Sequence, residues 1–232
     1  MMTLIKFLSA ILPVMILMWL LYRKSRDTSI TKKQKKWGFA LGAISTIIIM
    51  VCISPLHFDN SFLYVLLKSA LPEEFIKMVL MLALIKKYQY KSELDIILLC
   101  GTVGLGFACL ENIIYILTET KWIVTAIIRA TTSIPDHFVY AIIMGYFINK
   151  AIHLSSNNQQ KTINFIVAFV IPVLIHWVFN CSKKDLFNDI FAEELIMLIG
   201  LTLPTILVIC AFKYIKRLKS NTIICETLKT CQ

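Results

Sequence analysis

Seven runs of mostly apolar residues, each close to the length that crosses a lipid bilayer, constrain this chain more than any other feature. The runs lie at about 4–22, 37–54, 61–85, 94–117, 122–149, 163–181 and 193–212. A transmembrane helix needs about 20 predominantly apolar residues to cross the hydrocarbon core. The sequence therefore predicts an all-α fold: a polytopic transmembrane helical bundle with about seven spans, surrounded by the lipid bilayer.

Composition favours one membrane domain over any soluble domain. Hydrophobic residues make up 58% of the 232 positions, and the mean hydropathy is +0.74, whereas soluble domains are about 45–50% apolar. No polar stretch is long enough to build a soluble core. We expect a single integral membrane domain over 1–217, with its motif-bearing core at about 61–181, and a cytoplasmic tail over 218–232.

The distribution of basic residues between the runs predicts the orientation. Of the 24 Lys and Arg residues, 17 fall in the loops after the first, third and fifth runs and in the tail, while 4 lie on the opposite side and 3 within runs. Lys-rich and Arg-rich loops stay in the cytoplasm. We therefore expect the N-terminus outside and the C-terminus in the cytoplasm. The net charge of +10 is explained by topology, so no nucleic-acid partner is expected.

Three charged residues interrupt the third apolar run. Glu73, Glu74 and Lys77 stand in an otherwise apolar segment, and Lys77 shares a helix face with either glutamate. A charge at the bilayer centre costs about 2.5–3.5 kcal/mol even on the lenient insertion scale. A purely structural ion pair is one interpretation, but one lysine cannot neutralise two glutamates. The segment therefore needs partners from other spans or a wet cavity.

The fourth run supplies one such partner. Gly101, Gly104 and Gly106 precede Glu111 and Asn112, and glycines at this spacing let helices approach closely. We expect close packing to bring Glu111 towards the charged segment. The alternative is a packing helix whose Glu111 is solvated near the outer surface.

The fifth and sixth runs supply histidines. His137 lies near the middle of the fifth run, and His176 lies in the sixth with Asn180 four residues on, a spacing that points both side chains into one groove. A lone histidine inside a membrane is more often a packing residue than a ligand. At about 1.5 Å of depth per residue, however, four helices place their Glu or His side chains between the midplane and the outer leaflet. Ordinary helix tilt can bring side chains at these depths into contact.

This constellation suits water activation. A glutamate can act as general base towards a water that attacks a carbonyl, with Glu74 preferred because it lies three residues before Lys77. The histidines, with Asn180, can stabilise the oxyanion. Alternatively Glu111, His137 and His176 can form a metal site, with zinc as the ion. Because there is no His-Glu-x-x-His motif, the sequence leaves metal dependence open.

Two other classes of function stay open from the residues alone. Buried carboxylates and histidines are equally natural in a proton-coupled or cation-coupled transporter, although no paired halves with broken segments are visible. A non-catalytic immunity or binding membrane protein with the same fold is the other alternative.

The motifs resemble, in order, those of the PrsW family of intramembrane proteases. They are Glu73-Glu74-x-x-Lys77, Phe107-x-x-x-Glu111-Asn112, His137 with Gly145-Tyr146, and His176-x-x-x-Asn180. That family is similar to the wider group that includes CAAX prenyl endopeptidases and bacteriocin-immunity proteases. The resemblance covers about Leu71 to Asn180, nearly half of the chain. The sixth run departs from the family's strongest form, since Trp177 follows its histidine.

The resemblance implies an activity, a substrate class and roles for residues. It implies a multi-pass endopeptidase in a bacterial cytoplasmic membrane, which cuts single-span anti-sigma factors near the extracytoplasmic side, as in site-1 cleavage. The implied catalytic residues are Glu73, Glu74, Glu111, His137 and His176, supported by Lys77, Asn112 and Asn180. The resemblance identifies neither the particular substrate nor the separate roles of the two adjacent glutamates.

Overall fold

The computed structural model describes residues 1–23, 28–53, 61–182 and 202–218. Within these ranges the chain is helical apart from short turns, which confirms the all-α fold, and no strand occurs in them. The predicted tail from 219 onward and the first half of the predicted span 193–212 lie outside the described residues.

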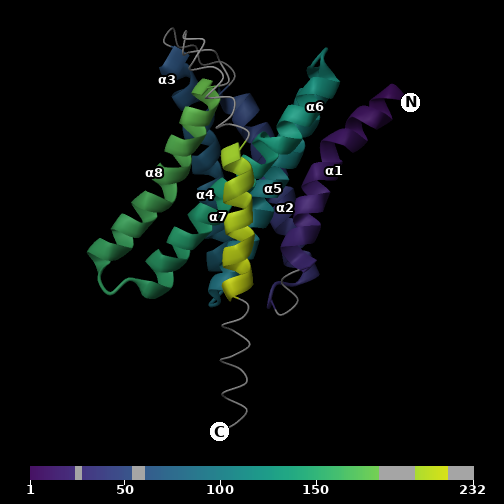
Figure 1. The fold of residues 1–232 in the computed structure, drawn as a ribbon. Coiled ribbons are helices and arrows are strands. Elements are labelled where there is room, and N and C mark those ends of the chain that lie inside the picture. The colour runs from purple at the N-terminus through teal and green to yellow at the C-terminus, as the bar shows by residue number, and fades with distance from the viewer. Residues whose placement is uncertain (24–27, 54–60, 183–201, 219–232) are drawn as a thin grey trace.

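Helices follow one another along the chain with short connections (Figure 1). In order they are α1 (Met2–Arg23), α2 (Lys32–Ile53), α3 (Ser61–Val65), the π-helical turn η1 (Leu66–Ala70), α4 (Leu71–Tyr88), α5 (Glu93–Thr118), α6 (Trp122–Thr131), α7 (Ser133–Asn149), the π-helical turn η2 (Lys150–Leu154) and α8 (Asn158–Ser182). Residues 202–218 form a further helix, drawn in yellow in Figure 1.

Four helices among the described residues are long and apolar enough to cross a membrane: α1, α2, α5 and α8. They correspond to the first, second, fourth and sixth predicted spans. The third predicted span is the continuous segment α3, η1 and α4, which carries several charges, and the fifth is divided between α6 and α7. The structure therefore supports a multi-pass membrane protein, with a less regular set of spans than the apolar runs indicate.

The third predicted span contains a π-helical turn immediately before Pro72. Proline has no backbone N–H to donate, and here it occupies the second position of α4, where the N–H of an ordinary residue has no partner within the helix. The Leu71 N–H bonds the Leu66 carbonyl, which closes the wider turn. This local geometry puts Glu73 and Glu74 in the first turn of α4, where both are buried.

The fifth predicted span is interrupted at Thr132. Its backbone leaves the helical region, with φ −121° and ψ −75°, and α7 starts at the next residue. Pro135 is consequently the third residue of α7, a position where the missing N–H leaves no hydrogen bond unmade. The break places His137 just after the first turn of α7.

Glycines allow α5 to lie at the centre of the bundle, against α2 and α7. A Cβ on Gly106 would stand 2.1 Å from the Phe39 carbonyl oxygen of α2, and a Cβ on Gly104 would stand 2.6 Å from the His137 carbonyl oxygen of α7. Neither contact is sterically possible, so only glycine permits these approaches. Close packing at the glycines before Glu111 was expected from the sequence and is confirmed.

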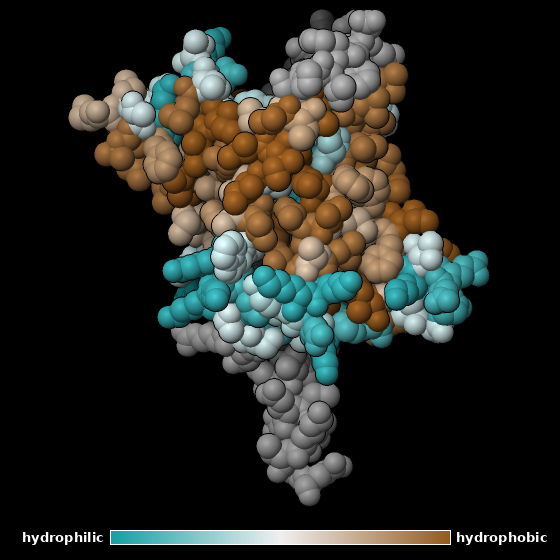
Figure 2. Space-filling view, turned by 180° about the vertical axis from the view of Figure 1, so that it is seen from behind, coloured by the Kyte–Doolittle hydropathy of each residue, from teal (hydrophilic) through white to brown (hydrophobic). Residues whose placement is uncertain are grey.

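Basic residues gather at one end of the bundle. Arg23 ends α1, Lys32 begins α2, and Lys86 and Lys87 end α4; Figure 1 draws these ends together at the bottom, opposite the N-terminus. The space-filling view in Figure 2 shows a hydrophilic band at this end, beneath a broad apolar surface. The basic ends of α1, α2 and α4 therefore lie on the same side of the bundle.

Candidate active site

A cavity of about 720 Å³ opens in the half of the bundle away from the basic end. Its walls come from the second halves of α2 and α5, from η1 and the first turn of α4, from the facing ends of α6 and α7, and from the last turns of α8. The residues that line the cavity include Glu73, Glu111, His137, His176 and Asn180. Side chains far apart in the sequence thus meet around one cavity.

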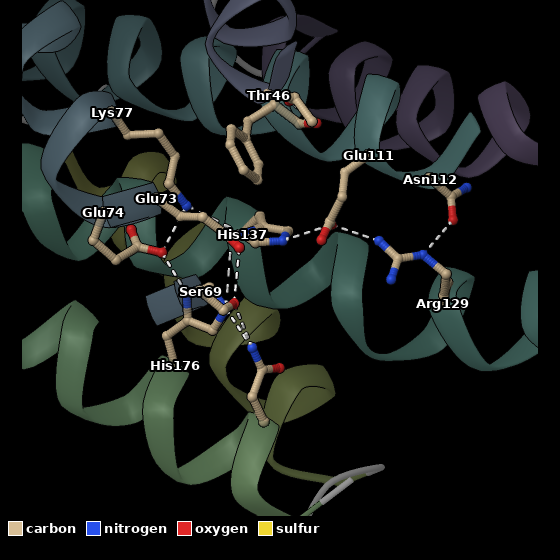
Figure 3. A network of polar contacts seen from close by, with 12 residues as sticks. Thr46, Ser69, Glu73, Glu74, Lys77, Glu111, Asn112, Arg129, His137 and His176 are labelled. Atoms are coloured by element: carbon tan, nitrogen blue, oxygen red, sulfur yellow. Dashed lines mark hydrogen bonds and ion pairs between the residues drawn. The ribbon is translucent and has the colours of Figure 1, made fainter. Parts of the chain in front are cut away.

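Glu74 and Lys77 form the fully buried ion pair beside this cavity. Lys77 Nζ lies 2.7 Å from Glu74 Oε1, and His176 Nδ1 lies 2.7 Å from the same oxygen. Lys77 Nζ also reaches His137 Nδ1 at 3.2 Å and sits 4.6 Å from the centre of the Phe107 ring. Glu74 therefore joins α4 to α8, and Lys77 joins α4 to α7 (Figure 3).

Glu73 is held more loosely than its neighbour. Ser69 Oγ donates to Glu73 Oε1 at 2.8 Å, and Asn180 Nδ2 donates to the same serine hydroxyl at 2.9 Å. Glu73 Oε2 is buried without a hydrogen-bond partner among the described residues, and His176 Nε2 lies 3.8 Å from it. One oxygen of Glu73 is thus left for a reactant or an ion in the cavity.

Glu111 connects α5 to α6 and α7. Its Oε2 lies 2.5 Å from Arg129 Nη2 and 2.9 Å from His137 Nε2. Arg129 Nε donates to Asn112 Oδ1 at 2.9 Å, and Asn112 Nδ2 donates to the Ala10 carbonyl of α1 at 2.7 Å. The arginine and asparagine therefore fix the carboxylate that orients His137, and they extend the network to the first helix.

The donors in this network determine the tautomers of both histidines. An ammonium group only donates, so His137 Nδ1 accepts from Lys77 and its Nε2–H donates to Glu111. A side-chain amide nitrogen also only donates, so His176 Nε2 accepts from Asn180 and its Nδ1–H donates to Glu74. In this pattern each imidazole has one donating and one accepting nitrogen.

Charge pairing distinguishes the three glutamates. Lys77 pairs with Glu74 and Arg129 pairs with Glu111. Among the described residues no lysine or arginine forms an ion pair with Glu73 within 4.0 Å, and this side chain is only 7% exposed. A buried carboxylate is stable only when its charge is compensated. Glu73 is therefore the glutamate whose charge a bound cation or a shared proton would compensate.

One group of side chains has the composition of a metal site. Glu73, His137 and His176 each offer a ligand atom, and these atoms lie within 4.8 Å of one another. Two imidazoles and one carboxylate form a ligand set typical of catalytic zinc, and the unpartnered Glu73 oxygen fits that role. The sequence grouped Glu111 with the two histidines; in the structure Glu73 takes that place, because Glu111 is bound to Arg129.

The residues predicted from the sequence converge. His176 is buried, at 3% exposure, and contacts both acids of α4, while His137 bonds Glu111. Asn112 bonds Arg129, and Asn180 bonds His176. Sequence analysis gave no role to Arg129 or Tyr140, although a charge inside an apolar run was a usable signal for the first.

A helical membrane bundle that gathers carboxylates and imidazoles around a cavity is the arrangement expected of an intramembrane hydrolase. The model of the PrsW family of intramembrane metalloproteases matches residues 35–210. This chain belongs to that family and is a peptidase.

Several proteins named Protease PrsW are similar to this chain. That of Oceanobacillus iheyensis is 31% identical over 191 residues, covering 80% of this chain and 83% of its own. That of Clostridioides difficile is 34% identical over 184 residues, covering 75% and 77% respectively. That of Bacillus subtilis is 28% identical over 159 residues, covering 66% and 71%. No solved structure matches the chain.

Proposed function

We propose that this peptidase cleaves a single-span membrane protein, of the anti-sigma-factor type, near the extracytoplasmic side of a bacterial cytoplasmic membrane, as in site-1 cleavage. The observation that carries the proposal is the convergence of two imidazoles and three carboxylates, from α4, α5, α7 and α8, on one cavity. The proposed catalytic residues are Glu73, Glu74, Glu111, His137 and His176, with Lys77, Asn112 and Asn180 in support.

The extracytoplasmic position rests on charge and on the place of the cavity. Basic helix ends gather at one end of the bundle and the cavity lies towards the other. By the positive-inside rule the basic end faces the cytoplasm. This supports an outside N-terminus, a cytoplasmic C-terminus and cleavage in the outer half of the bilayer. Seven spans within a single membrane domain over 1–217, followed by a tail over 218–232, remain part of the proposal.

Where no metal engages Glu73 Oε2, the mechanism that fits this geometry uses Glu73 as general base. Glu73 Oε2 takes a proton from a water as the water oxygen attacks the scissile carbonyl carbon. The same proton then passes to the leaving nitrogen as the C–N bond breaks, giving a carboxylic acid and an amine. Glu74 is the less suitable base, because it is fully buried between Lys77 and His176. It instead orients His176, as Glu111 orients His137.

Glu73, His137 and His176 are the residues that would hold a divalent metal such as zinc. A metal bound there would polarise the carbonyl and lower the pKa of a bound water. Lys77 Nζ, which donates to His137 Nδ1, competes with a cation for that nitrogen. Metal binding would therefore require the lysine to keep only its contact with Glu74.

Membership of a peptidase family does not favour the transporter or the non-catalytic immunity protein. The test is co-expression of the chain with a panel of tagged single-span membrane proteins. Wild type should cleave at least one, and Glu73→Gln, Glu111→Gln, His137→Ala and His176→Ala should accumulate it uncut at equal protein levels. Unchanged cleavage in all four variants would refute the proposal, and ion flux in proteoliposomes would indicate the transporter instead.

A further inference from the structure

Tyr140 carries a buried hydroxyl that has no hydrogen-bond partner among the described residues. The side chain lies on α7, three residues after His137, and is only 1% exposed, yet it lines the cavity. Burying a hydroxyl without a partner is unfavourable, because the hydrogen bond that it makes with water is lost. In the wall of a cavity, a hydroxyl without a partner is a hydrogen-bond donor that is available to a molecule entering the cavity.

The Tyr140 ring packs against both histidines of the centre. Its centroid lies 5.3 Å from that of His176, with the rings nearly parallel at 26°, and 6.1 Å from that of His137, with the rings nearly perpendicular at 85°. The aromatic ring is thus fixed by contacts on two sides. Tyr140, both histidines and Glu73 line the same cavity.

Other donors close to the centre are already bonded to protein acceptors. Lys77 bonds Glu74 and His137, Arg129 bonds Glu111 and Asn112, Asn180 bonds Ser69 and His176, and Ser69 bonds Glu73. A new acceptor would have to displace one of these bonds. Tyr140 can donate without breaking any hydrogen bond that the described residues form, so it is better prepared for a substrate than these four donors.

We propose that Tyr140 is a catalytic residue whose hydroxyl donates a hydrogen bond to the carbonyl oxygen of the scissile peptide bond. This inference rests on the proposed function. When the water oxygen bonds to the carbonyl carbon, the electron pair of the C=O double bond moves onto the oxygen. The Tyr140 hydroxyl stabilises this developing charge and keeps its own proton throughout. A fixed, neutral donor in a site shielded from water is well suited to that task.

The test compares Tyr140→Phe with Tyr90→Phe in the purified full-length protein. Tyr90 is a matched control because its hydroxyl is also buried without a partner among the described residues, but it lies in the connection between α4 and α5, at the basic end. The probe is the single-span protein of the panel that wild type cleaves. Tyr140→Phe should lower kcat about 100-fold or more, the loss expected for one oxyanion donor. KM, zinc content and melting temperature should stay unchanged.

Each outcome bears on a definite claim. A kcat for Tyr140→Phe equal to that of wild type and Tyr90→Phe overturns the inference and leaves the proposed function standing. A loss of activity accompanied by a lower melting temperature or lower zinc content also overturns it, since the hydroxyl would then have a structural role. A wild-type protein that cleaves no member of the panel refutes the proposed function, and the inference with it.

Discussion

The guanidinium of Arg129 lies 2.5 Å from the carboxylate of Glu111, Nη2 to Oε2, and both side chains are largely shielded from solvent. Removing one partner of a buried ion pair leaves an uncompensated charge, which costs about 3–5 kcal/mol. We therefore expect Arg129→Met to lower the free energy of unfolding by roughly this amount. Thermal or denaturant unfolding of the protein in detergent micelles measures the change.

A double-mutant cycle separates the ion pair from the arginine's other contacts. The combined variant Arg129→Met with Glu111→Leu removes both charges and should be more stable than Arg129→Met alone. Arg217→Met, at an exposed site in the helix 202–218, serves as the control for losing an arginine. If Arg129→Met has the same melting temperature as the wild type, the ion pair contributes no net stability and does not stabilise the fold.

The adjacent glutamates should respond differently to the same substitution. Glu74→Gln removes the charge that compensates Lys77 and should lower the melting temperature as well as activity. Glu73→Gln removes a carboxylate that pairs with no lysine or arginine of the described residues. It should therefore lower cleavage by about 100-fold or more, at little cost in stability. Activity assays and melting curves on both variants test this, and equal melting temperatures would contradict the division of roles.

Metal binding should depend on Glu73 and not on Glu111. The group that brings its ligand atoms within 4.8 Å contains Glu73, His137 and His176. We expect elemental analysis of purified protein to find zinc in wild type and in Glu111→Gln, and to find it greatly reduced in Glu73→Gln and His176→Ala. Zinc that persists in Glu73→Gln but disappears in Glu111→Gln would support the ligand set that the sequence alone indicated.

The convergence of the site could be predicted from the sequence because a charge inside an apolar run must find partners. Such runs contain Glu73, Glu74, Glu111, His137 and His176. Each of these side chains needs a polar partner inside the membrane, and the other helices of the set can supply one. Their similar depth along the membrane normal follows from counting residues. The all-α fold follows from the same apolar runs.

The sequence could not predict which polar side chains bond to one another, because these pairings depend on how each helix is rotated and on where a helix is interrupted. The break at Thr132 separates α6 from α7, and Arg129 on α6 binds Glu111, while His137 on α7 bonds the same carboxylate. A continuous helix over the fifth apolar run would turn these side chains differently. That is why the sequence assigned Glu111 to the metal group and gave no role to Arg129.

Adding a single methyl group at Gly106 should disrupt the packing of α2 against α5. A Cβ there would lie 2.1 Å from the Phe39 carbonyl oxygen, a backbone atom that cannot move without separating the two helices. Overpacking of this kind costs about 1–3 kcal/mol, and we expect Gly106→Ala to lower stability by at least that amount and to reduce cleavage, because α5 carries Glu111. Gly38→Ala is the matched control on the same helix pair, since its Cβ would meet only side chains, the end of Leu99 at 3.3 Å and Thr102 at 3.5 Å. Equal melting temperatures for the two alanine variants would show that the α2–α5 contact is looser than the structure indicates.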